Sequence, residues 1–319
     1  MSHGDVKIGG KMKIGIQSGN SVKELGIEKA YKMYADAGFE TIDLGFNDEL
    51  PSKIINSLNF EGNVFEKEID EIEAHFSAHY AEIKKNGLEV SQAHAPFPAY
   101  VVGKPESLDH MIEIYKKCIV YCDKIGCKNL VVHGITLTRK DRINTPDTIN
   151  ALNDKLYTSL IPTLLKTNVT VCLENLFGGA GGIISGVCSN PHEAVEMIDR
   201  YNAIAGKECF GLCLDTGHLN LLKLDMRWYI PILGKRIKAV HIHDNDGMAD
   251  RHKAPYTGTL VWKDFYSALK EIEYNGDLNF ETYHQTSTGD TDEELILPWL
   301  ELICKIGNHF KKKIEGSEE

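Results

Sequence analysis

Eight short β-rich runs alternate with longer helical patterns along the 319 residues of the chain. Several of these runs are almost continuously apolar, which is typical of parallel strands covered on both faces. This alternation predicts a parallel sheet, and eight units favour closure of the sheet into a barrel over an open sheet. The predicted strands are Lys13–Gln17, Thr41–Phe46, Glu89–Ala95, Asn129–Gly134, Val169–Asn175, Gly211–Thr216, Ile237–His243 and Leu278–Tyr283.

Helical patterns fill the segments between these strands. Asn190 followed by Pro191 is typical of a helix start, where the asparagine caps the first turn. Pro162 lies inside the fourth helical pattern and should kink or split that helix. The predicted helices are Glu24–Ala37, Glu66–Lys85, Ser107–Ile125, Pro146–Lys166, Pro191–Tyr201, Met226–Leu233, Trp262–Glu273 and Glu293–Ile306. The predicted long loops are Phe46–Val64 and Phe177–Asn190.

The length fits one α/β barrel, whose usual size is around 250 residues plus insertions. Neither a Gly-x-Gly-x-x-Gly segment after the first strand nor a Walker loop occurs, which counts against a dinucleotide fold or a P-loop enzyme. The sequence shows no linker and no sign of a second domain. We therefore predict an α/β protein made of a single (β/α)₈ TIM-barrel domain over residues 1–319, of which residues 1–10 are flexible.

Composition indicates where the protein is located and which classes of partner it can bind. No run approaches the roughly 18 apolar residues of a membrane-spanning helix, and the N-terminus lacks a signal-peptide core, so we expect a cytoplasmic protein without a membrane partner. No two of the eight cysteines form a Cys-x-x-Cys pair, which favours reduced thiols. The net charge of −11 disfavours a nucleic-acid partner. A homodimer would be an ordinary assembly for such an enzyme.

Successive predicted strands, from the third to the eighth, end in carboxylate or imidazole side chains. The carboxyl ends of the strands form one face of an α/β barrel, and active sites are built there. Three carboxylates and one imidazole from different strands can surround one divalent cation, whose charge offsets their mutual repulsion. Without an ion, such a cluster would raise its own pKa values and lower stability. The residues are His94, His133, Glu174, Asp215 with His218 after it, His241 with His243, and Glu281.

Each of these residues also has an ordinary structural interpretation. A strand-end glutamate such as Glu174 is more often a surface or capping group than a ligand, and Asp215 could simply cap the helix that follows it. Glu281 has the same ambiguity. His94 and His133 could equally be core histidines with satisfied hydrogen bonds. It is the complete set at one barrel mouth that favours a functional site.

Over nearly its whole length the chain resembles the xylose isomerase-like barrels, the family that holds sugar isomerases and epimerases. The Asp-Thr-Gly-His and His-x-x-Asp segments together make this resemblance specific, although each alone would be weak. The usual Pro-Gly-x-Gly before the last helix reads Pro-Tyr-Thr-Gly at Pro255–Gly258, which weakens the expectation of a substrate contact there. The motifs are Leu173–Asn175, Leu214–His218, Val240–Gly247, Asp250–His252 and Gly276–Glu281.

The resemblance implies a divalent metal, often manganese or a similar ion, bound by two glutamates, an aspartate and a histidine. Both His241 and His243 begin a His-x-x-Asp segment, and both can face inward because Ile242 separates them. We expect His241, since many relatives keep the first histidine and vary the second. Oxygen and nitrogen ligands suit manganese, zinc, cobalt or magnesium. The implied metal ligands are Glu174, Asp215, His241 and Glu281.

The resemblance also implies an aldose–ketose isomerase or a keto-sugar epimerase acting on a sugar or sugar phosphate. The substrate's carbonyl oxygen and neighbouring hydroxyl would chelate the ion, which acts as a Lewis acid and stabilises an enediolate. Glu174 and Glu281 would be the catalytic acid and base. The residues implied to bind substrate or a second metal are His94, His133, His218, His243, Asp250 and His252.

Two other functions remain open. Zinc apurinic endonucleases of the same superfamily hold three zinc ions through nine residues, and this chain can supply that set. Its acidic composition and its lack of Arg-rich or aromatic interleaved loops disfavour a nuclease. A non-catalytic sugar-binding barrel would bind its ligand without a metal. The nine residues are His94, His133, Glu174, Asp215, His218, His241, Asp250, His252 and Glu281.

Overall fold

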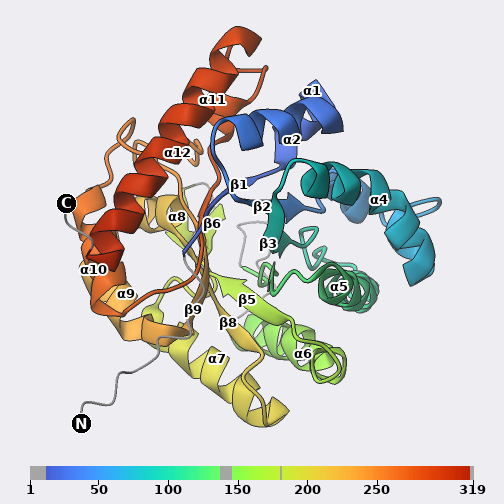
Figure 1. Cartoon of the computed structure of the whole chain (residues 1–319). Coiled ribbons are helices and arrows are strands. Elements are labelled where there is room, and N and C mark those ends of the chain that lie inside the picture. Colours follow the sequence, from blue (N-terminus) through green and yellow to red (C-terminus); the bar gives the residue numbers. More distant parts are fainter. Residues whose placement is uncertain (1–11, 137–145, 180–181, 317–319) are drawn as a thin grey trace, which may run out of the picture.

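A computed structural model describes residues 12–136, 146–179 and 182–316, so the predicted flexibility of residues 1–10 lies outside the described residues. Eight parallel strands lie at the centre with helices around them (Figure 1), in the order β10-β1-β2-β3-β4-β5-β8-β9. A parallel bridge joins Ile242, just after β9, to Phe280 of β10. The amide of Ile242 donates to the carbonyl of Asn279 at 2.9 Å, which closes the sheet. The predicted TIM barrel is confirmed.

All eight predicted barrel strands are present. Most end one to three residues earlier than predicted, because the polar residues at the barrel mouth leave the regular ladder to form loops and caps. The strands are β1 (Ile14–Gln17), β2 (Thr41–Gly45), β3 (Glu89–His94), β4 (Asn129–Val131), β5 (Thr170–Glu174), β8 (Phe210–Asp215), β9 (Ile237–His241) and β10 (Leu278–Phe280).

Helices cover the outside of the barrel (Figure 1). The predicted start at Asn190 is confirmed, since its side-chain oxygen accepts from the amide of His192 at 3.0 Å and Pro191 occupies the first turn. The longer helices are α1 (Gly19–Leu25), α2 (Ile27–Asp36), α4 (Ile69–Lys85), α5 (Glu106–Ile125), α6 (Pro146–Leu164), α7 (Pro191–Ala205), α9 (Met226–Leu233), α10 (Trp262–Glu271) and α12 (Glu293–Glu315). The short helices are α3 (Ser52–Ser57), α8 (Thr216–Leu221) and α11 (Tyr283–Thr286), with 3₁₀ turns η1 (Val64–Glu66) and η2 (Gly234–Arg236).

Two predictions about helices were wrong, and so were both predictions of long loops. The helix predicted over Glu24–Ala37 is two helices, because Gly26 between them adopts φ +84°, which ends α1. Pro162 does not split α6, because it stands in the last turn, close to the end of the helix at Leu164.

Both predicted long loops contain regular structure. The first, Phe46–Val64, includes the short helix α3. The second, Phe177–Asn190, includes an antiparallel hairpin of β6 (Phe177–Gly179) and β7 (Ile183–Ser185). Each hairpin strand has only three residues, too few to show a sequence period.

The main hydrophobic core lies between the strands and the surrounding helices, and a second, small apolar layer lies inside the barrel. That inner layer consists of Val131, Cys172, Cys213 and Ala239 from four neighbouring strands. All eight cysteines are buried free thiols, as predicted. Within the described residues, no helix combines the length and the apolar character needed to traverse a lipid bilayer.

Candidate metal centre at the carboxyl ends of the strands

The polar residues at the barrel mouth are placed by the two-residue period of the strands. Two positions beyond the members of the inner apolar layer stand His133, Glu174, Asp215 and His241, so their side chains enter the same interior one step nearer the mouth. Glu281 joins them from just after β10. His133 is partly buried, and the other four are at most 6% exposed. The barrel therefore collects these side chains at one site.

His241 lies among three carboxylates. Its Nδ1 is 3.6 Å from Glu174 Oε2, 3.9 Å from Asp215 Oδ2 and 3.6 Å from Glu281 Oε2. Among the described residues, none forms a hydrogen bond with this buried nitrogen. Metal–ligand bonds of about 2.0–2.2 Å keep the ligand atoms of one ion within roughly 4.4 Å of one another. These distances and donor types suit a divalent cation. Asp215, His241 and Glu281 offer ligand atoms within 4.8 Å of one another, and Glu174 and His94 form a similar group with the same histidine.

The ring of His241 is oriented differently from those of three other histidines at the mouth. His94, His218 and His252 each place Nδ1 on a backbone carbonyl, which can only accept, so these rings turn Nε2 toward the mouth. His241 instead turns Nδ1 toward the carboxylates, because its Nε2 lies 3.1 Å from the buried carboxylate of Asp43. The carbonyls are those of Ala95 at 2.8 Å, Asn175 at 3.0 Å and Glu281 at 3.1 Å.

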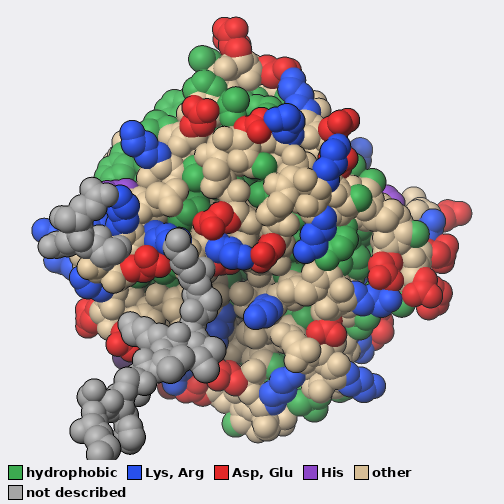
Figure 2. Space-filling model, viewed as in Figure 1, with side chains coloured by type: hydrophobic (Ala, Val, Ile, Leu, Met, Phe, Trp, Pro, Cys, Tyr) green, Lys and Arg blue, Asp and Glu red, His purple; other side chains and the backbone are tan. Residues whose placement is uncertain are grey.

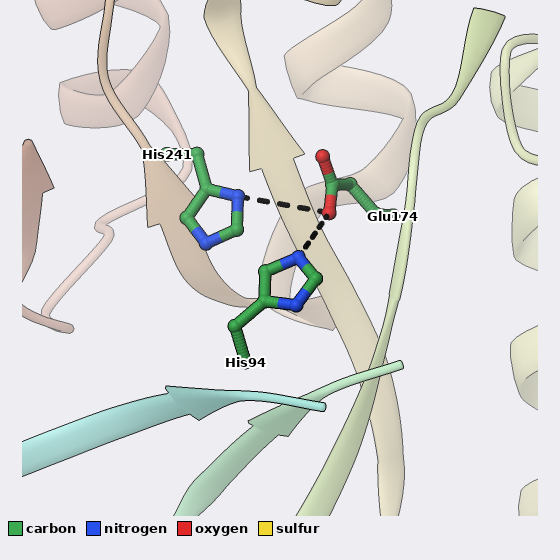
Figure 3. A group of neighbouring side chains, drawn as sticks. All are labelled: His94, Glu174 and His241. Carbon is green, nitrogen blue, oxygen red and sulfur yellow. Dashed lines mark ion pairs between the residues drawn. The ribbon is translucent and has the colours of Figure 1, made fainter. Parts of the chain in front are cut away.

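A second group of ligand-type atoms adjoins Glu174. His133 Nε2 is 2.9 Å from Glu174 Oε2 and 3.1 Å from His94 Nε2. Figure 3 shows His94 and His241 approaching the same carboxylate from different sides, at 3.7 Å and 3.6 Å. Glu174 thus lies between the two groups.

A third group surrounds Asp250. Its Oδ2 is 3.0 Å from His252 Nε2 and 3.6 Å from His218 Nε2. Its Oδ1 and the Nδ1 of His243 are buried, lie 3.9 Å apart, and have no hydrogen-bond partner among the described residues. His243 Nε2 is 2.9 Å from Asp215 Oδ2. The structure therefore brings together every residue predicted for the site, in three adjoining groups.

Asp215 both caps a helix and faces the polar centre, the two roles that its position in the sequence suggested. Its Oδ1 accepts from the amide of His218 at 2.7 Å and caps α8. Its Oδ2 faces His243 and, at 3.9 Å, His241. One carboxylate therefore fixes the start of a helix and also contributes to the polar centre.

Electrostatic pairing keeps the buried acids ionised. Burial raises the pKa of Glu174, but His133, His241 and His218 outweigh it and hold the pKa well below its usual range. The pKa of Asp215 is also lowered, against its burial, by His218 and His243. Burial lowers the pKa of His241, yet Cys213 and the neighbouring carboxylates raise it well above the ordinary value. The neighbouring histidines thus favour the ionised form of both buried acids.

A cavity of about 410 Å³ opens over this centre. Its lining includes polar residues, among them Glu174, Glu281 and His252. Aromatic rings form part of its wall: Phe97 stacks on His133 with centroids 4.5 Å apart, and Phe177 meets His218 edge-on at 5.0 Å. The cavity thus combines aromatic and other apolar lining with a set of oxygen and nitrogen ligands, as small-molecule sites do.

Three residues at the site were not predicted. Gln17 Nε2 and the Tyr283 hydroxyl donate to Glu281 Oε1 at 3.0 Å and 2.9 Å, and Asp43 contacts His241. Gln17 and Asp43 lie side by side on β1 and β2. The available signal was a polar side chain at an inward position of an apolar strand, as in Thr-Ile-Asp-Leu, because such positions normally hold hydrophobic residues.

Known proteins agree with this architecture. A family described as the xylose isomerase-like TIM barrel matches residues 32–302. Similar solved structures include a D-tagatose 3-epimerase-like protein, with 18% identity, a TM-score of 0.66 and 93% and 99% of the two chains covered. An L-ribulose 3-epimerase has 18% identity, a TM-score of 0.67 and 96% coverage of each chain. At these identities the likeness demonstrates the fold.

A curated relative also matches part of the chain. The uncharacterised protein y4fM of Sinorhizobium fredii is 28% identical over 174 residues, which are 54% of this chain and 52% of that relative. The match thus spans about half the length of each protein.

Proposed function

The chain belongs to the xylose isomerase-like TIM-barrel family, and on that premise we propose that it is a divalent-metal-dependent sugar isomerase or epimerase. The observation that carries the proposal is the unpartnered, buried Nδ1 of His241 among three carboxylates. The residues that would hold the ion are Glu174, Asp215, His241 and Glu281. Manganese, zinc, cobalt and magnesium all suit such ligands.

A bound divalent ion supplies Lewis-acid polarisation of the substrate carbonyl. Glu174 and Glu281 both line the cavity, and each can take a proton from, or return one to, the carbon beside that carbonyl. Gln17 and Tyr283 hold Glu281 by its Oε1. Return of the proton to the opposite face gives an epimer, whereas its return to the adjacent carbon gives an aldose–ketose isomer.

The names of the similar structures favour epimerisation. One is a D-tagatose 3-epimerase-like protein and the other an L-ribulose 3-epimerase, so their names point to keto-sugars changed at carbon 3. We therefore place a keto-sugar first among the substrates of this chain. Its polar groups would face the carboxylates and histidines, and its apolar face would lie against the aromatic wall.

The test is the Mn²⁺-dependent conversion of a panel of ketohexoses and ketopentoses in D₂O, followed by NMR. The wild-type protein should incorporate deuterium at the carbon that exchanges its proton. Glu174→Gln and Glu281→Gln should each lower turnover by about 10² or more, since general acid–base catalysis contributes about 10²–10⁴. Circular dichroism should show that both variants keep the fold.

The matched control is Glu208→Gln, which changes a carboxylate that pairs with Lys238 on the surface. It should turn over like the wild type. Full activity in either Glu174→Gln or Glu281→Gln would refute the catalytic assignment.

A zinc-dependent apurinic endonuclease is the second candidate, because the three adjoining ligand groups contain all nine residues of the trinuclear set. The described residues include four trios of potential ligands, and within each trio the ligand atoms lie within 4.8 Å of one another; His243, Asp250 and His252 form one of them. Against it stands the net charge of −11. On the face seen in Figure 2, acidic and basic side chains are interspersed. Nicking of a duplex that carries an abasic site, by protein holding three zinc ions, would favour the nuclease.

A further inference from the structure

A carboxylate that the proposed mechanism does not use lies beneath the polar centre. Asp43 of β2 is fully buried and stands in register between Gln17 of β1 and Gln92 of β3. Its Oδ2 lies 3.1 Å from His241 Nε2 and 2.7 Å from Gln92 Nε2. Its Oδ1 has no hydrogen-bond partner in the described part of the chain.

The neighbours of Asp43 fix the direction of its hydrogen bonds. Gln92 Oε1 accepts from Asn279 Nδ2 at 2.7 Å, so the amide nitrogen of Gln92 is the atom that faces Asp43. A carboxylate accepts, so Asp43 requires His241 to carry a proton on Nε2. A neutral His241 then has its lone pair on Nδ1, the atom turned toward Glu174, Asp215 and Glu281.

Fold stability gives no evident reason to keep a charge at this place. A buried carboxylate loses its hydration, and apolar residues of similar size are often no less stable. Asp43 also leaves one oxygen unsatisfied. His94, His218 and His252, by contrast, are oriented by neutral backbone carbonyls. The Nδ1 of His218 also lies 3.2 Å from Glu174 Oε1, but His241 is the one of these four rings whose orienting partner is a carboxylate in place of a backbone carbonyl.

We propose that Asp43 is a positioning residue that acts through His241. It holds the ring so that Nδ1 faces the carboxylates, and its charge makes that nitrogen a stronger electron donor to a divalent cation. The inference rests on the metal centre of the proposed function, but not on the identity of the sugar.

The test measures Mn²⁺ affinity in protein first stripped with a chelator, with free Mn²⁺ followed by electron paramagnetic resonance. Asp43→Asn keeps the shape of the side chain and removes its charge, and Asp43→Leu also removes the acceptor. Both should bind Mn²⁺ about 10–100-fold more weakly than the wild type. The control is Asp277→Asn, the same exchange at the opposite end of the barrel, where Asp277 accepts from the Lys13 amide. It should keep wild-type affinity.

A second readout separates positioning from a structural role. In zinc-loaded, ¹⁵N-labelled protein, the Nε2 proton of His241 should give a downfield NMR signal that shifts in Asp43→Asn. The thermal midpoint of the metal-free Asp43→Asn protein should not fall. Mn²⁺ affinity within twofold of the wild type, or an equal loss in Asp277→Asn, would overturn the inference. If Asp43→Leu does not fold, Asp43→Asn alone decides.

The two proposals fail in different ways. If the wild type binds Mn²⁺ and Asp43→Asn binds it weakly, yet no sugar is converted, the sugar assignment fails and Asp43 keeps its role. If sugar is converted and Asp43→Asn binds Mn²⁺ like the wild type, only the role of Asp43 fails.

Discussion

His241 and His243 lie two residues apart on one chain segment, yet their rings have different partners. Each ring pairs Nε2 with an aspartate, and each Nδ1 lacks a hydrogen-bond partner in the described part of the chain. The Nδ1 of His241 faces three carboxylates, whereas the Nδ1 of His243 faces Asp250 at 3.9 Å. Both begin a His-x-x-Asp segment and both can face inward, so sequence alone could not separate them. The difference arises from Asp43, a residue 198 positions away from His241 in the chain.

Replacement of each histidine should separate their roles. We predict that His241→Asn abolishes measurable Mn²⁺ binding, because it removes a ligand. His243→Asn should weaken binding by about 10–100-fold, because it removes a partner of the ligand Asp215. Isothermal titration of metal-stripped protein measures both. Stronger loss in His243→Asn would mean that His243 is the ligand.

The stability of the metal-free protein should depend on pH through His252. Burial lowers the pKa of His252, but Glu281 and Asp250 raise it to about 9 from the ordinary 6.5. Because the folded pKa lies above the unfolded one, this pairing stabilises the metal-free protein fully below pH 6.5, and the stabilisation is lost as the pH rises to about 9. The thermal midpoint of chelator-treated protein should therefore fall across this window, and fall less in His252→Asn.

Asp250, the carboxylate that pairs with His252, does not reverse this fall in stability with rising pH. The pKa of Asp250 is lowered, against its burial, by His218 and His252, so its contribution is already complete above its ordinary pKa of 3.8. A midpoint that stays constant or rises between pH 6.5 and 9, or an equal slope in His252→Asn, would contradict the pairing.

At the scale of elements, apolar runs and terminal signals were enough to predict all eight barrel strands and the start of α7. Short elements were missed because three-residue strands such as β6 show no period, and because Gly26 divides one helical pattern into two. At the site, the sequence pattern identified the titratable residues that stand at strand ends. Gln17 does not titrate, and Asp43 lies inside its strand, so neither matched the pattern that revealed Glu174 or Asp215.

The start of α7 gives a prediction for stability. Asn190→Ala removes the oxygen that accepts from the His192 amide, so urea unfolding should show a loss of about 1 kcal/mol. Asn190→Ser retains a capping hydroxyl and should retain most of the stability. An unchanged midpoint in Asn190→Ala would show that the cap adds nothing measurable.

At the scale of the whole molecule, barrel closure assembles the site. His241 ends β9 and Glu281 follows β10, and these are the two strands whose contact closes the sheet. The amide of Glu281 donates to the carbonyl of Ile242 at 3.1 Å, which fixes the spacing between the two strand ends. The strands run parallel and their connecting helices lie outside the barrel, so ligand-type residues from six strands meet at one mouth. The site therefore concentrates charged groups in one place, whereas the net charge of −11 describes the whole chain.

An anomalous difference map from crystals soaked in Mn²⁺ would show directly whether the four proposed ligands share one ion. We predict one strong peak within bonding distance, about 2.0–2.4 Å, of Glu174, Asp215, His241 and Glu281. The absence of a peak at this place, or a peak bound by other residues while these four turn apart, would contradict it.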